Sequence, residues 1–225
     1  ASAAHTDTKT AAALTLLKSA SATVTAGPLQ LWGALKTGHG TALSLAVVGT
    51  KQAIGNALVV KTALSIVELS GFENASVLVS SVGDAESKRR FTRELTNFFK
   101  KNAEVVPHDL KSKSVHDPDA AYRELLARKD PLMEKAPRTI DYLSENSRKV
   151  MMETLSFFES VGIMYTIDSR LHTDPSVAGD LMFAIDAVDK SGEKIRIATG
   201  GRFENDTRKA GLTEGRPATA LTLSL

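Results

Sequence analysis

The chain has 225 residues, a formal net charge of +2 at pH 7 and no cysteine. The lack of cysteine excludes disulfide bonds, thiolate catalysis and cysteine-ligated zinc or iron–sulfur sites. It is compatible with a reducing cytoplasm, where we expect the protein. The charge is too near balance to indicate nucleic-acid binding by itself. No apolar run reaches the roughly 18 residues that cross a bilayer, so we expect no membrane partner.

The start of the chain predicts a flexible N-terminus followed by one domain. Residues 1–13 are small and polar, and they lack the basic-then-apolar order of a secretory signal. We predict that residues 14–225 form a single domain. A domain of this size buries roughly 70% of its unfolded surface, so it needs no disulfide or metal to hold it together.

The next segments predict a hairpin, a helix and a strand. Two apolar runs, 29–35 and 41–48, are joined by a short Gly-containing linker, which is typical of a β-hairpin. Residues 51–71 are apolar nearly all round, which indicates a helix buried on more than one side. Residues 75–84 predict a buried strand that runs into a turn.

Asp84 is placed to cap the next helix, because an aspartate accepts hydrogen bonds from the free N–H groups of a first helical turn. Four apolar residues share one face of that helix: Phe91, Leu95, Phe98 and Phe99. Its N-terminal half carries a basic cluster: Lys88, Arg89, Arg90 and Arg93. This cluster is either an RNA or phosphate contact or a solvated face, and the interleaved Glu86 and Glu94 favour the solvated face.

Residues 102–117 are polar and predict a loop. The loop carries His108 and His116, but a spacing of eight without a carboxylate pattern is a weak metal signal. We therefore expect surface histidines and no metal site. Asp117, followed by a proline, predicts the start of another helix, and Ser144 predicts the cap of a third.

The C-terminal third predicts strands again. One strand covers residues 163–168, a hairpin joins 180–188 to 194–200, and residues 218–225 alternate like a strand. Strands and helices are mixed without regular βαβ alternation. We therefore predict the α+β class, with a mainly antiparallel sheet flanked by helices.

Four segments resemble the catalytic domain of bacterial-type histidyl-tRNA synthetases, which are class II aminoacyl-tRNA synthetases. Residues 77–102, which begin VLVSSVGD, are similar to the family's strand–helix segment after motif 2. Residues 126–171 are similar in order and spacing to the family's next run. ATGGRF at 198–203 resembles the second histidine-specific signature, and residues 211–225 resemble the start of motif 3. The resemblance implies a truncated class II synthetase fold.

The chain departs from that family at the residues that handle ATP and histidine. The first histidine-specific signature belongs after Leu171, where residues 172–176 read HTDPS. The hairpin that matches motif 2, residues 29–48, has a shortened loop and no arginine. Motif 1, the helix of motif 3 and the anticodon-binding domain have no counterpart in the sequence. Adenylate formation needs cations on the phosphates, so the resemblance implies a scaffold that has lost them.

The resemblance also implies a candidate ligand pocket at Gly200, Gly201, Arg202 and Phe203. Glycine would let a small ligand, such as a histidine-like molecule, approach the backbone closely. The alternative is that the glycines only end a strand and that Arg202 pairs with a carboxylate such as Glu204.

The sequence therefore predicts a histidyl-tRNA synthetase-like module that binds or regulates and is not itself an enzyme. The regulatory subunit of ATP phosphoribosyltransferase resembles the same catalytic domain and lacks the anticodon-binding domain. One alternative is a divergent or partial histidine–tRNA ligase that forms histidyl-adenylate and charges tRNA. Another is a structural assembly partner.

The expected partner is another protein or a second copy of the chain, and tRNA binding stays open. We expect no cofactor, and no nucleotide-binding residue is assigned. Lys36 and His39, in the turn of the first hairpin, are expected to be solvated rather than phosphate contacts.

Overall fold

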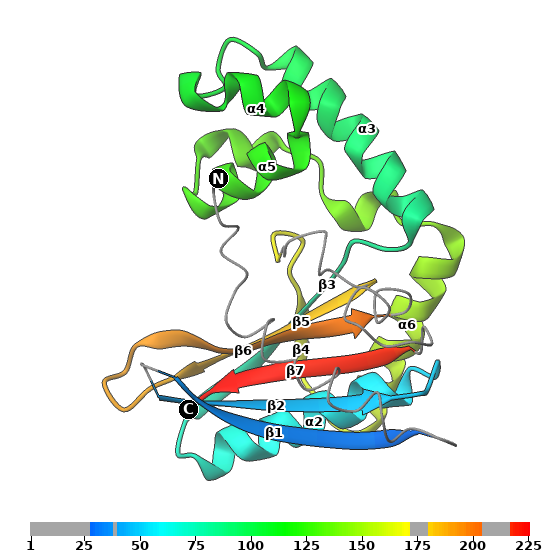
Figure 1. The fold of residues 1–225 in the computed structure, drawn as a ribbon, viewed down its shortest axis with the longest axis vertical. Coiled ribbons are helices and arrows are strands. Elements are labelled where there is room, and N and C mark those ends of the chain that lie inside the picture. Colours follow the sequence, from blue (N-terminus) through cyan, green and yellow to red (C-terminus); the bar gives the residue numbers. More distant parts are fainter. Residues whose placement is uncertain (1–27, 38–39, 172–179, 204–216) are drawn as a thin grey trace.

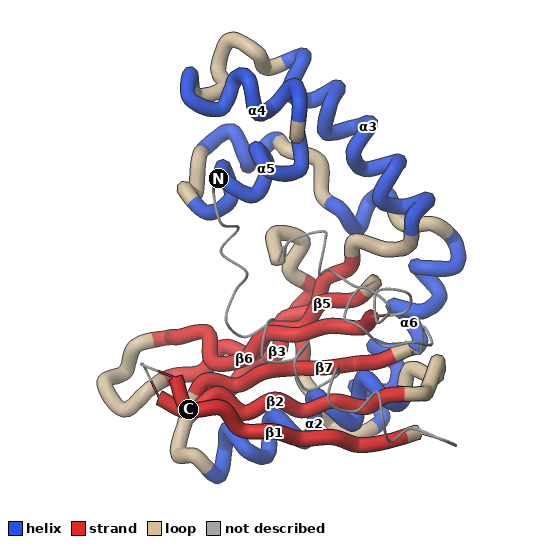
Figure 2. Tube along the Cα trace, in the orientation of Figure 1, coloured by secondary structure: helices blue, strands red, loops and turns tan. Residues whose placement is uncertain are grey.

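A twisted seven-stranded sheet forms one layer of the protein, and a group of helices extends beyond one end of it (Figures 1 and 2). The structure is a computed structural model that describes residues 28–37, 40–171, 180–203 and 217–225. The predicted flexible segment, residues 1–13, lies outside the described residues, so its flexibility stays a prediction.

The sheet is antiparallel except at one edge. Its strands are β1 (Leu29–Thr37), β2 (Gly40–Val48), β3 (Glu73–Ser81), β4 (Tyr165–Ile167), β5 (Leu181–Val188), β6 (Lys194–Phe203) and β7 (Ala218–Ser224). They lie in the order β1-β2-β7-β6-β5-β3-β4, and only the β3–β4 pair is parallel. The predicted α+β class with a mainly antiparallel sheet is confirmed.

The helices fall into two groups. The longer ones are α2 (Ile54–Leu69), α3 (Ala85–Lys101), α5 (Pro118–Ala127) and α6 (Glu145–Ser160). Short turns between them are η1 (His108–Leu110), α4 (Lys111–His116), η2 (Pro131–Lys135) and η3 (Thr139–Tyr142). In Figure 1, α2 and α6 lie beside the sheet, whereas α3, α4 and α5 lie together away from the strands.

The loop predicted over residues 102–117 is wrong, because η1 and α4 occupy much of it. Two apolar residues of this polar stretch are buried: Val106 is 3% exposed and Leu110 is 1% exposed. They pack into the core of the α3–α5 group, and this tertiary anchoring folds a segment that has little helical signal of its own.

Each helical group has its own hydrophobic core. The sheet packs against α2 and α6 through residues such as Val60, Phe158 and Phe183, and the rings of Phe158 and Phe183 lie 5.8 Å apart. A second cluster joins α3 to α5 through Phe91 and Leu125. Burial of one such side chain contributes about 1.5–3 kcal/mol, so each group has an independent source of stability.

Three predicted helix caps are confirmed. Asp84 Oδ1 accepts the backbone N–H of Ser87 at 2.9 Å, and Asp117 Oδ1 accepts that of Ala120 at 2.9 Å. Ser144 Oγ accepts the N–H of Ser147 at 3.1 Å. These side chains satisfy N–H groups that have no partner within the helix.

Candidate functional site

One face of the sheet packs against α2 and α6. The other face, called here the far face, consists of the strand side chains that point away from α2. Because side chains alternate along a strand and directly opposed residues share a face, the register defines its rows. One row crosses β2, β7 and β6 through Ser44, Thr222 and Thr199. It places three hydroxyl groups side by side.

One group of this hydroxyl row has no hydrogen-bond partner among the described residues. Ser44 Oγ and Thr222 Oγ1 form a hydrogen bond of 2.8 Å. Thr199 Oγ1 is buried, and it makes no hydrogen bond within the described part of the chain. Buried hydroxyls in native proteins are usually hydrogen-bonded to protein, water or ligand. Thr199 therefore offers a free donor and acceptor on the far face.

The neighbouring rows of the far face are apolar. One contains Ala46, Ala220 and Gly201, and the next contains Val48, Ala218 and Phe203. These side chains form one buried cluster, to which Leu31 of β1 adds. A ligand at this part of the far face would therefore meet apolar side chains and no charged group among the described strand residues.

The basic side chains of the far face lie near the start of β6, far along the strand from Phe203, and they have an acidic neighbour. Among the described strand residues, Lys194 and Arg196 are the basic side chains that the register places there. Arg196 Nε donates to Asp186 Oδ1 at 2.8 Å, and its Nη2 donates to Oδ2 at 3.3 Å. Lys194 Nζ lies 4.0 Å from the same carboxylate. Asp186 therefore balances one of these two positive charges.

The four predicted pocket residues do not share one face. Gly201 and Phe203 lie on the far face, whereas Gly200 and Arg202 point toward α2, since they oppose Leu221 and Thr219. Arg202 is 3% exposed and donates through Nη2 to the backbone oxygen of Lys51 at 2.6 Å. A ligand role for the four residues stays a prediction. Glu204, the partner of Arg202 in the alternative interpretation, lies outside the described residues.

The two glycines permit close contact between strands. A Cβ built on Gly200 would overlap the backbone oxygen of Ala220, and one on Gly201 would overlap that of Leu181. Backbone from the neighbouring strands thus occupies the space that a side chain would need. This contact is sufficient to explain both glycines without a ligand.

Sequence reasoning missed a buried polar network on the α2 side of the sheet. Asn56 of α2 donates through Nδ2 to Thr154 Oγ1 of α6 at 2.9 Å, and its Oδ1 accepts from Thr219 Oγ1 of β7 at 2.5 Å. A single asparagine therefore connects two helices to the sheet. The available signal was a polar residue, Asn56, at helical spacing with the apolar Val60, Ala63 and Val67.

Two raised pKa values occur in α5, away from the far face. Burial raises the pKa of Asp119, although a hydrogen bond from Thr92 at 3.1 Å opposes the rise. Burial also raises the pKa of Tyr122 to about 12. Its hydroxyl donates to the backbone oxygen of Pro137 at 3.3 Å. Both groups belong to α5 and have structural partners.

The remaining candidate residues have surface positions where the structure describes them. His108 and His116 are exposed, and so is Lys36. In the basic cluster, Arg90 pairs with Glu86 and Arg93 Nε lies 3.5 Å from Glu94 Oε1, as the solvated-face interpretation expects.

His39 and residues 172–176 lie outside the described residues. Within the described ranges, no group of three or more His, Asp or Glu side chains is arranged to hold a metal ion. No helix among the described residues is both long and apolar enough to span a membrane.

The similar proteins found by sequence comparison are histidine–tRNA ligases. No known family model matches the chain. It is 28% identical over 182 residues to the histidine–tRNA ligase of Bacillus subtilis, which covers 79% of this chain and 42% of the ligase. It is 27% identical over 189 residues to the ligase of Thermosynechococcus vestitus, with 80% and 41% covered. The chain thus spans well under half the length of these relatives.

Solved structures show the same fold. Apo histidyl-tRNA synthetase from S. aureus superposes with a TM-score of 0.72 at 18% identity, over 96% of this chain and 53% of that one. A chain of the ATP phosphoribosyl transferase (HisG:HisZ) complex from Thermotoga maritima gives 0.52 at 14% identity, over 93% and 78%. The chain is therefore a homologue of the histidine–tRNA ligases, and its fold is that of a class II aminoacyl-tRNA synthetase catalytic domain.

Proposed function

We propose that this chain is a histidyl-tRNA synthetase-like module that works as a binding or regulatory protein and not as a ligase by itself. The observation that carries the proposal is the charge of the far face. Its described strand residues present hydroxyl and small apolar side chains, and its two basic residues lie beside Asp186.

The physical argument concerns the nucleotide. Negative charge develops on the phosphates during adenylate formation, and fixed cations must stabilise it. A side chain already committed to a carboxylate contributes little to a second anion, because the pair is close to neutral. The described far face is therefore suited to an uncharged or zwitterionic small molecule rather than to ATP.

The proposed ligand site is the hydroxyl row with Gly201 and Phe203 on the far face, and Gly200 and Arg202 would support it from the α2 side of β6. Thr199 Oγ1 supplies a free hydrogen-bonding group, and Phe203 supplies an apolar wall. Arg202 would act indirectly, by fixing the position of β6, because its guanidinium points toward α2. The ligand we propose is a histidine-like small molecule, in the cytoplasm.

A protein partner fits the same proposal. One structural neighbour is named as an ATP phosphoribosyltransferase regulatory subunit/histidyl-tRNA synthetase, from Bacillus halodurans C, with a TM-score of 0.58. Another belongs to the HisG:HisZ complex. These names support a regulatory role in which this fold acts on a second protein.

The test combines ATP–pyrophosphate exchange in the presence of histidine with thermal shift. We expect the full chain to give no exchange above background, with a full-length histidine–tRNA ligase as the positive control. We expect histidine to raise the melting temperature and ATP to leave it unchanged. A ligand at a hundred times its dissociation constant adds about 2.7 kcal/mol to stability, which such a scan detects.

A matched pair of variants locates the ligand. Thr199→Val removes the free hydroxyl, and we expect it to abolish the shift with histidine. Thr62→Val, on the α2 side where the hydroxyl bonds to Leu58 O at 2.8 Å, should leave the shift intact. Histidine-dependent exchange by the chain alone would refute the proposal.

The second candidate is a divergent or partial histidine–tRNA ligase that needs a further polypeptide. The observation that favours it is the run of matches to histidine–tRNA ligases, each far longer than this chain. Exchange that appears only when a polypeptide with the missing segments is added would select this candidate.

A further inference from the structure

A second hydroxyl of the far face is buried without a hydrogen bond. Ser80 lies near the end of β3 and is 0% exposed, and its Oγ makes no hydrogen bond within the part of the chain that the structure describes. The register places Ser80 on the far face, because it opposes Met182 of β5, which in turn opposes Gly201 of β6. Among the described strand residues, the far face therefore carries two such hydroxyls, those of Ser80 and Thr199.

An unpartnered hydroxyl inside a sheet is unfavourable for the fold. It gives up its hydrogen bonds to water on burial and gains none in return. Alanine at position 80 would keep the apolar contacts of the serine without this cost. Proteins depart from such rules mainly at functional sites, so two unpaired hydroxyls on one face indicate a molecule that binds to both.

The spacing of the two hydroxyls suits a small molecule. Ser80 lies two strands away from Thr199 and two residues further along, since Thr199 opposes Ala184 and Ala184 opposes Leu78. With strands about 4.8 Å apart and residues about 3.4 Å apart, the Cα atoms are separated by roughly 12 Å. A hydrogen bond at each end takes up about 2.9 Å, which leaves roughly the span of one amino acid. Thr199 and Leu78 are only half-buried, so a ligand can enter from this row.

The surroundings of the two hydroxyls differ. The strand residues beside Ser80 on the far face are apolar and belong to one buried cluster: Val82, Met182 and Ala184. Thr199 instead lies in the hydroxyl row, toward the ion pair of Arg196 with Asp186. A charged group is costly to bury among apolar side chains. The charged end of a ligand therefore belongs at Thr199, and a neutral ring belongs at Ser80.

We infer that Ser80 is a specificity-determining residue of the far-face site, and that its hydroxyl bonds to a ring nitrogen of an amino acid such as histidine while Thr199 holds the charged end. The inference rests on the proposed function and deepens it by naming the residue that selects the ring. A hydroxyl can donate to a ring nitrogen or accept from a ring N–H. A ring without either group would leave Ser80 unpaired, and such a ligand is rejected.

The test is calorimetric titration of the full chain with histidine and with thienylalanine, which has the same backbone and a five-membered ring without nitrogen. We expect the native chain to bind histidine about tenfold more tightly, as the loss of one hydrogen bond implies. Ser80→Ala should raise the histidine dissociation constant by about tenfold and leave that of thienylalanine unchanged. Its melting temperature without ligand should be equal to or above that of the native chain, because the substitution removes an unpaired group.

Two further variants serve as controls. Thr139 is 2% exposed and lies in η3, outside the sheet, and its hydroxyl is also unpaired within the described ranges. Thr139→Val should therefore leave both dissociation constants unchanged. Thr199→Val should weaken both amino acids alike, because it removes the contact with the end that they share.

The outcomes separate this inference from the proposed function. If the native chain binds histidine and Ser80→Ala binds it equally well, as a bound water at Ser80 would allow, the inference is wrong and the proposed function stands. No preference of the native chain for histidine, or an equal loss for both amino acids in Ser80→Ala, also overturns the inference alone. If the native chain binds neither amino acid, the proposed ligand is refuted and the inference with it.

Discussion

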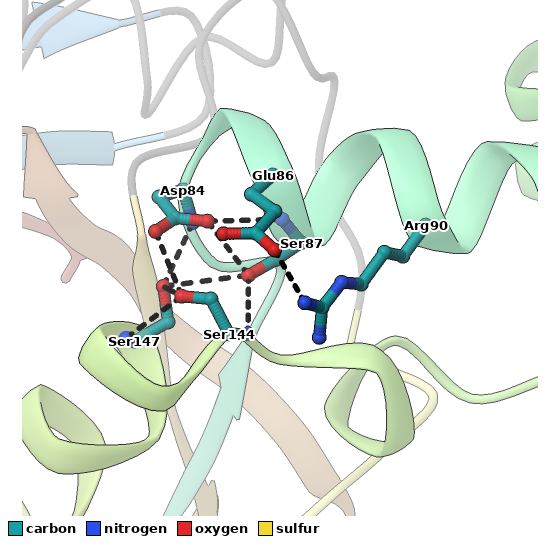
Figure 3. Close-up of polar contacts among 6 residues, drawn as sticks. All are labelled: Asp84, Glu86, Ser87, Arg90, Ser144 and Ser147. Carbon is teal, nitrogen blue, oxygen red and sulfur yellow. Dashed lines mark hydrogen bonds and ion pairs between the residues drawn. The ribbon is translucent and has the colours of Figure 1, made fainter.

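Asp84 and Ser144 each cap a helix and also bond to each other, because Ser144 Oγ donates to Asp84 Oδ2 at 2.7 Å (Figure 3). The N-termini of α3 and α6 therefore meet at one carboxylate. Ser87 Oγ donates to Asp84 Oδ1 at 2.8 Å and accepts the backbone N–H of Ser144 at 2.8 Å. Ser147 Oγ accepts the backbone N–H of Asp84 at 2.9 Å. This junction holds the α3–α5 group to the sheet.

The first prediction concerns the stability of this junction. Asp84→Ala removes the acceptor for three donors, from Ser87 and Ser144, and should lower the free energy of unfolding by about 2–3 kcal/mol, since one cap alone is worth about 1 kcal/mol. Urea denaturation measures the change. The control is Asp117→Ala, which removes an exposed cap of α5 and should cost only about 1 kcal/mol. Equal costs would show that the junction adds nothing beyond capping.

The second prediction concerns pH. Burial by itself raises the pKa of Asp84, but hydrogen bonds from the Ser87 N–H and from the Ser144 and Ser87 hydroxyls outweigh it and lower the pKa to about 2. A carboxyl whose pKa is lower in the folded state stabilises the fold above its unfolded pKa of about 3.9, and loses that effect as the pH falls. The stability of the native chain should therefore decrease between about pH 4 and pH 2.

The measurement is a difference between two proteins. Asp84→Asn keeps a capping residue but cannot titrate, so about 1–2 kcal/mol of the acid-dependent loss should be missing from its profile. Other carboxylates titrate in both proteins and cancel in the difference. Parallel profiles for the native chain and Asp84→Asn would contradict the assigned role of the charge.

The caps were predictable from sequence because they are local. An acceptor side chain one residue before an amphipathic run needs no knowledge of the rest of the fold, and Asp84, Asp117 and Ser144 all follow this rule. The strands of the two hairpins were equally visible. The link between Asp84 and Ser144 was not, because it depends on how two helices 60 residues apart are brought together.

The site was harder to predict because a strand distributes neighbouring residues to opposite faces. The signature ATGGRF suggested a single pocket wall. Side chains alternate along a strand, however, so Gly201 and Phe203 lie on the far face, whereas Gly200 and Arg202 lie on the α2 side. The hydroxyl row of Ser44, Thr222 and Thr199 is invisible in sequence, since it exists only once β2, β7 and β6 are in register. Strand order is set by tertiary packing and not by local pattern.

The third prediction concerns the paired glycines. Gly201→Ala places a methyl group against the backbone oxygen of Leu181, so β5 or β6 must shift, and we expect a loss of about 1–3 kcal/mol in stability. Gly200→Ala should act similarly through Ala220. Thr199→Ala, in the same strand, serves as the control and should cost less, because its hydroxyl makes no hydrogen bond among the described residues. Thermal unfolding ranks the three variants, and a neutral Gly201→Ala would show that the space is open.

The fourth prediction separates the anchoring role of Arg202 from a ligand role. The guanidinium donates to the backbone oxygen of Lys51, just before α2, from a position that is 3% exposed. Arg202→Met keeps much of the apolar stem but removes the charged donor, and a hydrogen bond to a charged group contributes about 1.5–3 kcal/mol. The surface pair gives the control: Arg196→Met loses a half-exposed contact with Asp186 and should cost about 1 kcal/mol or less.

The two roles of Arg202 differ in what histidine does to the variant. If Arg202 only anchors β6 to the start of α2, histidine should still raise the melting temperature of Arg202→Met by as much as it raises that of the native chain, from a lower starting value. We expect this result, because the described contact of the guanidinium is with backbone on the α2 side of the sheet. Loss of the histidine shift at unchanged stability would instead place Arg202 in contact with the ligand.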